Sequence, residues 1–135
     1  MVKVTVYARE GCPWCDLLLE ALDRYSYLFT DVDFEVVLET GSDFGPLLRH
    51  VAVKRSRRPY PAEEVFYREA LKRGVPPERA LETALRGAAA PQLVVEAKAP
   101  NGEERKIVVI GSAATPEMAD SLVLNLRKLI NALSL

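Results

Sequence analysis

The sequence predicts an α/β fold in which a four-stranded mixed β-sheet is flanked by helices. Three observations lead to this fold class. The chain begins with the order strand, helix, strand; two further strand-like runs follow late in the chain with a hairpin signal between them; and the last element is an amphipathic helix. The 135 residues, 49% of them hydrophobic, are enough to bury one core, so we expect a single domain over residues 1–135.

The first half of the predicted sheet lies at the start of the chain. Apolar and polar residues alternate over residues 2–7, which predicts a strand that ends before Gly11. From Pro13 to about Phe29, apolar residues recur every three or four positions, so we expect an amphipathic helix with proline in its first turn. Residues 33–40 form a short β-rich run that predicts the second strand. Because a helix separates these two strands, they should be parallel.

The other half of the sheet is a predicted hairpin. Residues 92–98 and 105–111 are strand-like runs, and the Asn-Gly pair at 101–102 is a strong hairpin signal. These two strands should therefore be antiparallel. Residues 115–117 (Thr-Pro-Glu) then supply a helix cap, a first-turn proline and a first-turn acid, and apolar residues three or four apart follow as far as Leu133. We expect the chain to end in a helix.

Between these halves lies a predicted helical insertion, at about residues 42–88. Proline and glycine delimit two helices in it, at about 62–73 and 77–86. We interpret this pair as a cap packed against the sheet, and a helix-turn-helix is the alternative. The expected core residues of the cap are Tyr60, Phe66 and Tyr67. His50 is interpreted as a structural residue.

The insertion is basic, although the whole chain has a net charge of −1. Residues 49–90 carry ten Lys or Arg and five Glu. The stretch KRSRRPYP at 54–61 combines four of these positive charges with a tyrosine, a combination that could meet phosphates or steer an acidic protein. The simplest interpretation is a solvated loop, and the glutamates in the helices that follow argue against a nucleic-acid partner.

Cys12 and Cys15 are the only cysteines, and they lie where the first strand gives way to the first helix. A C-x-x-C beside a β-α-β pattern is typical of a thiol redox site. Cys12 should lie at the helix N-terminus, where free N–H groups and the helix dipole stabilise a thiolate, so it is the candidate nucleophile. Cys15, on the apolar side of the helix, is the candidate resolving thiol. Such a pair needs no bound cofactor.

Two other interpretations of the pair remain. Free cysteines are often buried, so both could simply fill core positions. A metal clip would need more ligands, because structural zinc usually takes four Cys or His, and besides the thiols the chain offers only His50 and carboxylates. We therefore expect no metal site.

The motif Cys12-Pro13-Trp14-Cys15, between a strand and a helix, resembles the glutaredoxin and thioredoxin superfamily, most closely its glutaredoxin-like members. The resemblance covers roughly residues 1–40 and 88–135. It implies a thioredoxin-like fold in which the helical insertion precedes a cis-proline that faces the cysteines.

This resemblance also implies substrate contacts. Pro91 matches the cis-proline, and Ala90 before it would offer its backbone to a bound peptide or thiol. Arg9 matches a basic position that helps to hold the thiolate or the carboxylate of glutathione. The ring of Trp14 could cover the disulfide or meet an apolar partner surface.

Two positions depart from patterns within the superfamily. Thioredoxins carry a buried Asp where this chain has Val6, which favours glutaredoxin-like chemistry. Glutaredoxins tend to have a Gly-Gly turn and an acidic pair that contact glutathione, whereas residues 111–115 here read Gly-Ser-Ala-Ala-Thr.

Together these features predict a cytoplasmic thiol-disulfide oxidoreductase that serves electron transport and cell redox homeostasis. Its substrate would be a disulfide-containing protein or a low-molecular-weight thiol, and a separate reducing thiol system would regenerate it. All uncharged apolar runs are shorter than the roughly 18 residues of a membrane span, which argues against a membrane partner. The alternative is a redox-inactive adaptor module that uses the basic insertion to hold a protein or a nucleic acid.

Overall fold

The computed structural model describes residues 2–9, 11–39 and 52–135. In these ranges the elements are β1 (Val2–Ala8), α1 (Pro13–Arg24), the 3₁₀ turn η1 (Ser26–Leu28), β2 (Val32–Leu38), β3 (Ala52–Arg55), the 3₁₀ turn η3 (Pro61–Glu63), α2 (Glu64–Lys72), α3 (Pro77–Arg86), β4 (Gln92–Lys98), β5 (Glu104–Ile110) and α4 (Pro116–Leu133). None of these helices combines the length and the hydropathy of a membrane-spanning segment. His50 and the first part of the insertion lie outside the described residues.

The strands form one mixed sheet in the order β3-β2-β1-β4-β5. β1 pairs in parallel with β2, and β4 pairs antiparallel with β5, as the sequence predicts. β4 also pairs antiparallel with β1, which joins the two halves of the sheet. The four expected strands are thus present, and the short β3 adds a fifth, parallel to β2 at one edge. β3 belongs to the insertion, in which we expected two helices and a loop but no strand. Its four residues are too few for an alternating pattern to identify.

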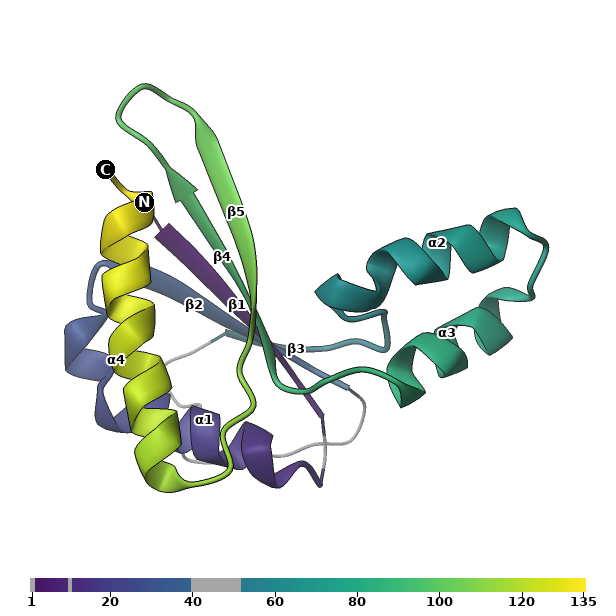
Figure 1. The fold of residues 1–135 in the computed structure, drawn as a ribbon, viewed down its shortest axis with the longest axis horizontal. Helices are drawn as coiled ribbons and strands as arrows, with labels where there is room; N and C mark the ends of the chain where they lie inside the picture. Colours follow the sequence, from purple (N-terminus) through teal and green to yellow (C-terminus); the bar gives the residue numbers. More distant parts are fainter. Residues whose placement is uncertain (1, 10, 40–51) are drawn as a thin grey trace.

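Helices α1 and α4 lie together on one face of the sheet (Figure 1). Side chains of a strand alternate between the two faces, and on β1 Val4 and Val6 point into the core beneath these helices. Leu18 from α1 and Ile130 from α4 are completely buried against them. Burying this apolar surface, at roughly 25 cal/mol per Å², is the main force that fixes the two helices on the sheet.

Local signals in the sequence predict where α4 begins but not where α1 ends. α4 begins as expected, because the Thr115 hydroxyl caps it by accepting a hydrogen bond from the Met118 amide at 3.2 Å. α1 ends at Arg24, earlier than the expected Phe29. The chain tightens into η1 there, and Phe29 still reaches the core with 4% exposure. The apolar spacing therefore continued past the end of the helix.

The α2–α3 hairpin projects away from the sheet (Figure 1), so the expectation of a cap packed on the sheet is wrong. Every residue of α2 is at least partly exposed, and Phe66 is 74% exposed. Among the expected core residues, Tyr67 is partly buried and Tyr60 is buried. α2 contacts mainly α3, so the outer face of this two-helix unit meets solvent even where it is apolar.

On the face of the sheet opposite α1 and α4, Glu35 bridges two lysines. Its carboxylate lies 3.1 Å from Lys3 Nζ on β1 and 2.8 Å from Lys54 Nζ on β3. The two ion-paired lysines, Lys54 first and then Lys3, hold the pKa of Glu35 below its ordinary value of 4.5, against the opposing effect of burial. The bridge therefore favours the folded chain wherever this carboxylate is ionised, and it ties the short β3 to the sheet.

We expect Glu35→Gln to lower the thermal unfolding midpoint at neutral pH by a few degrees, because the amide keeps the size but loses both ion pairs. The stabilisation should be fully present above pH 4.5, the ordinary pKa, and lost as the pH falls through the lower folded-state pKa. The two proteins should thus converge in acid. Circular dichroism melts across this range test the prediction, with Glu104→Gln on β5 as an exposed control. A difference that stays constant into acid contradicts it.

Candidate active site

Cys12 lies in the turn that leads from β1 into α1. Gly11 before it has a φ of +68°, in the left-handed region that glycine adopts without steric cost. Cys12 is the N-cap of α1, and Pro13 is its first residue. The Cys15 amide donates a hydrogen bond to Cys12 Sγ at 3.2 Å. The sulfur therefore lies at the positive end of the helix, where negative charge is stabilised.

Cys15 lies one turn further along α1, with its Sγ 2.6 Å from Cys12 Sγ. Both cysteines are free thiols, and Cys12 is 6% exposed whereas Cys15 is completely buried. Burial raises the pKa of Cys15, the hydrogen bond with Cys12 adds to this effect, and the backbone amide of Arg9 opposes it. A disulfide bond is about 2.05 Å long, so a small movement of either side chain would bring the sulfurs to bonding distance.

Residues 88–91, here called the strap, run past the two sulfurs into β4. The peptide bond between Ala90 and Pro91 is cis, the geometry that the resemblance implies. The Ala90 carbonyl oxygen lies 3.9 Å from Cys12 Sγ and also accepts a hydrogen bond from the Ser112 hydroxyl at 3.1 Å. The strap and the loop after β5 thus form one wall beside the sulfurs.

The expected substrate-contact residues differ in exposure. Trp14, between the two cysteines, is 50% exposed. Ala90 is buried at 6% exposure, and Pro91 is fully buried. Of these three side chains, Trp14 therefore offers the apolar surface that a partner molecule can reach without rearrangement of the site.

The Arg9 side chain faces the base of the insertion. Its Nη2 donates hydrogen bonds to the carbonyls of Leu85 at 2.9 Å and Ala88 at 3.2 Å. Its Nε lies 3.6 Å from the Glu39 carboxylate, and its Cζ lies 5.3 Å from the centroid of the Tyr60 ring. The resemblance to glutaredoxins implies that this side chain holds a thiolate or a substrate carboxylate, and that role stays a prediction. The contacts with the insertion were not part of it.

No family model matches the chain. Mycoredoxin 1 of Corynebacterium glutamicum is 32% identical over 78 residues, which make up 53% of this chain and 99% of mycoredoxin 1, and the same values hold in two strains. The chain belongs to the glutaredoxin/thioredoxin superfamily. At a general level, this membership supports a thiol-disulfide oxidoreductase type of function.

Two solved structures are also similar to the chain. A thioredoxin-related protein from Neisseria meningitidis serogroup B gives a TM-score of 0.49 at 14% identity, over 97% of this chain and 85% of that one. A secreted Mycobacterium tuberculosis disulfide oxidoreductase homologous to Escherichia coli DsbE gives a TM-score of 0.41 at 10% identity, over 92% and 81%. These TM-scores are too low for either structure to define the fold of this chain.

Sequence analysis missed Gln92, which joins the insertion to the sheet in this superfamily member. Its Nε2 donates to the Ala89 carbonyl at 2.9 Å and to the Glu63 carboxylate at 2.8 Å, and its Oε1 accepts from the Ala62 amide at 3.0 Å. The residue is completely buried. A polar residue directly before the apolar run Leu93–Val95 was the available signal, because buried polar groups require partners. Ser112 gave no such signal.

Gly111 provides close packing behind the strap. Its amide donates to the Pro91 carbonyl at 2.8 Å. A Cβ at this position would lie 2.7 Å from Leu93 Cδ1, 3.0 Å from Leu18 Cδ2 and 3.3 Å from Pro91 Cγ. Both leucines are completely buried, so they have little room to move aside.

We expect Gly111→Ala to destabilise the protein by about 1–3 kcal/mol, the usual cost of overpacking a core. Gly87→Ala is the matched control, because its nearest contact would be the Thr83 carbonyl at an ordinary 3.8 Å. The control should change the free energy of unfolding by less than about 1 kcal/mol. Urea unfolding of both variants measures the difference. Equal effects of the two substitutions would show that the packing around Gly111 is looser than described.

Proposed function

We propose that this protein is a glutaredoxin-like thiol-disulfide oxidoreductase that works through Cys12 and Cys15. The observation that carries the proposal is the 2.6 Å approach of the two sulfurs at the N-terminus of α1. The amide of Cys15 donates to Cys12 Sγ, so it can stabilise the negative charge of a nucleophilic thiolate. Cys15 is completely buried, and its sulfur lies next to Cys12 Sγ.

In the proposed cycle, the Cys12 thiolate attacks one sulfur of a substrate disulfide. A Cys12–substrate disulfide forms, and the other substrate sulfur leaves as a thiolate. Cys15 then attacks Cys12 Sγ, passing its proton to the departing substrate thiolate, and the Cys12–Cys15 disulfide forms. The dithiol has lost two electrons and the substrate disulfide has gained them. A separate reducing thiol system returns the pair to the dithiol.

The substrate is a disulfide-containing protein or a low-molecular-weight thiol in its disulfide form. Trp14 is the exposed contact for its apolar part, which agrees with its 50% exposure beside the sulfurs. Ala90 and Pro91 would contact the substrate through the backbone of the strap. We further propose that the chain acts as one domain, in the cytoplasm, without a bound cofactor.

The alternative function is that of a redox-inactive adaptor that binds a partner through the insertion. The observation in its favour is the exposure of apolar residues on α2, where Val65 is 67% and Phe66 74% exposed. This role does not need either thiol. Replacement of Cys12 therefore separates the two functions.

We expect Cys12→Ser to reduce disulfide exchange to the uncatalysed level, because the nucleophile is removed. Cys15→Ser should still attack a disulfide but should accumulate the mixed disulfide, because the resolving thiol is missing. Intact-protein mass spectrometry after exposure to a low-molecular-weight disulfide distinguishes these products. Equal adduct formation on the two variants would contradict the assignment of Cys12 as nucleophile.

A redox titration of the wild-type protein in thiol-disulfide buffers complements the variants. Exchange chemistry predicts one two-electron transition between about −270 and −120 mV. Thiols that react only after denaturation would contradict the proposed function. Among the described residues, no three His, Cys, Asp or Glu side chains gather into a possible metal-binding cluster. Stoichiometric metal that Cys12→Ser releases would favour metal handling instead.

A further inference from the structure

The four carbonyls of the strap are each held by a different donor. Ala88 accepts from the Arg9 guanidinium at 3.2 Å, Ala89 from the Gln92 amide at 2.9 Å and Ala90 from the Ser112 hydroxyl at 3.1 Å. The Pro91 carbonyl accepts from the Gly111 amide at 2.8 Å. These donors come from the end of β1, from β4 and from the loop after β5. The position of the strap beside Cys12 is therefore set by three side chains and one backbone amide, and all of these donors except Gln92 are far from the strap in sequence.

Arg9 differs from the other donors because it also belongs to the redox turn. It lies three residues before Cys12. Its backbone amide and its positive charge both oppose the rise that burial causes in the pKa of the Cys15 thiol. Its side chain is 28% exposed and reaches two carbonyls at the end of α3 and in the strap, those of Leu85 and Ala88. One residue thus lies close in sequence to Cys12 and binds the insertion with its side chain.

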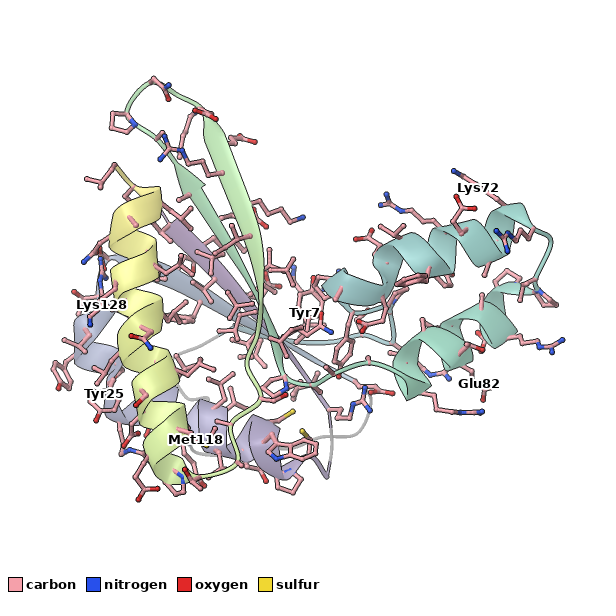
Figure 2. The ribbon with its side chains drawn as sticks, viewed as in Figure 1. Tyr7, Tyr25, Lys72, Glu82, Met118 and Lys128 are labelled. Atoms are coloured by element: carbon pink, nitrogen blue, oxygen red, sulfur yellow. The ribbon has the colours of Figure 1, made fainter. Side chains whose placement is uncertain are left out.

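The base of the insertion is packed around this guanidinium. The Tyr60 ring lies beneath it, and Tyr60 in turn packs on Tyr7 with the ring centroids 6.1 Å apart. Tyr7 lies where the sheet meets the base of the hairpin, whereas Lys72 marks the far end (Figure 2). Burial raises the pKa of Tyr60 to about 12, so the phenol stays neutral beside Arg9. The hairpin is fixed at its base and projects at its tip.

We propose that Arg9 is a positioning residue that couples the seating of the insertion to the redox equilibrium of Cys12 and Cys15. Its planar guanidinium holds the end of α3 and the strap together, and the strap in turn holds the Ala90 carbonyl beside Cys12. Both hydrogen bonds leave the same nitrogen, Nη2, while the planar guanidinium lies over the Tyr60 ring. A lysine keeps the positive charge but has no planar group that could lie on this ring while it donates to both carbonyls. The coupling therefore requires arginine and not only a cation. This inference rests on the proposed function, because it concerns the equilibrium of the same pair.

The equilibrium to be measured is that of the Cys12–Cys15 disulfide with two buffer thiols, which yields the dithiol and the buffer disulfide. Arg9→Lys and Arg9→Met should both shift it toward the protein disulfide by about fivefold or more, because the strap that Arg9 seats lies against the free thiols and losing this seat removes contacts made by the reduced pair. Arg105→Lys is the matched control. Arg105 also donates to two carbonyls, those of Leu133 at 3.1 Å and Leu135 at 2.8 Å, and lies at the opposite end of the sheet. It should leave the equilibrium unchanged.

Two further measurements make the outcomes distinct. Amide hydrogen exchange should quicken across residues 85–90 in both Arg9 variants, and circular dichroism should show that they remain folded. If Arg9→Lys behaves as wild type while Arg9→Met shifts, Arg9 acts through charge alone and the inference is overturned. Faster exchange with an unchanged equilibrium overturns it as well, because the contact is then only structural. A wild-type protein without any two-electron transition would instead refute the proposed function.

Discussion

The close seating of the strap against the first turn of α1 is the constraint on which the candidate site depends. A carbonyl beside a buried sulfur must be satisfied within the protein, since an unpaired buried polar group costs about 1–3 kcal/mol. Every strap carbonyl has a donor, and each donor is fixed by its own element. The approach of Ala90 to Cys12 is therefore a product of the whole sheet edge. Neither the cysteine motif nor the proline alone would produce it.

The seating of the strap also makes the two ends of the insertion differ in burial. Its base contains buried Tyr60 and the engaged carbonyl of Leu85, so it cannot move independently of the site. Its tip consists of α2 and the start of α3, whose polar and apolar side chains alike meet solvent. Ion pairs in the hairpin, such as Arg68 with Glu64, are exposed and contribute little to stability. The hairpin is thus held by hydrogen bonds and packing at one end only.

The sequence predicts the elements whose signals lie in neighbouring residues, but it does not predict how the hairpin packs. Elements whose signals are local were predicted well: the alternation of β1, the proline and cysteine that open α1, and the Thr115 cap of α4. The placement of the cysteines at a helix N-terminus followed from such signals. The cap prediction failed because the apolar spacing of α2, including Phe66, is the same for a helix that packs on a sheet and for one that packs on a single neighbour.

Two site residues have contacts that sequence analysis did not predict, and these contacts join positions that are distant in the chain. Gln92 contacts residues 29 and 30 positions away, and Arg9 contacts residues more than 70 positions away. A side chain's chemistry shows that it needs a partner but not where the partner lies. Arg9 illustrates this limit, because its spacing from Cys12 drew attention to it while its acceptors belong to the insertion. Only the folded arrangement pairs them.

The similarity to mycoredoxin 1 bears on the contacts that Arg9 and Gln92 make with the insertion. That relative is matched almost in full by little more than half of this chain, so a superfamily member can exist without many of the residues present here. A chain without the α2–α3 hairpin has no Leu85 or Ala88 carbonyl for an arginine at position 9 to bind. Burying a guanidinium there would leave its donors unsatisfied, which is costlier than omitting the charge. The side chains at positions 9 and 92 are therefore suited to a chain that carries the insertion, and the cysteine turn and the α2–α3 hairpin form one physical unit.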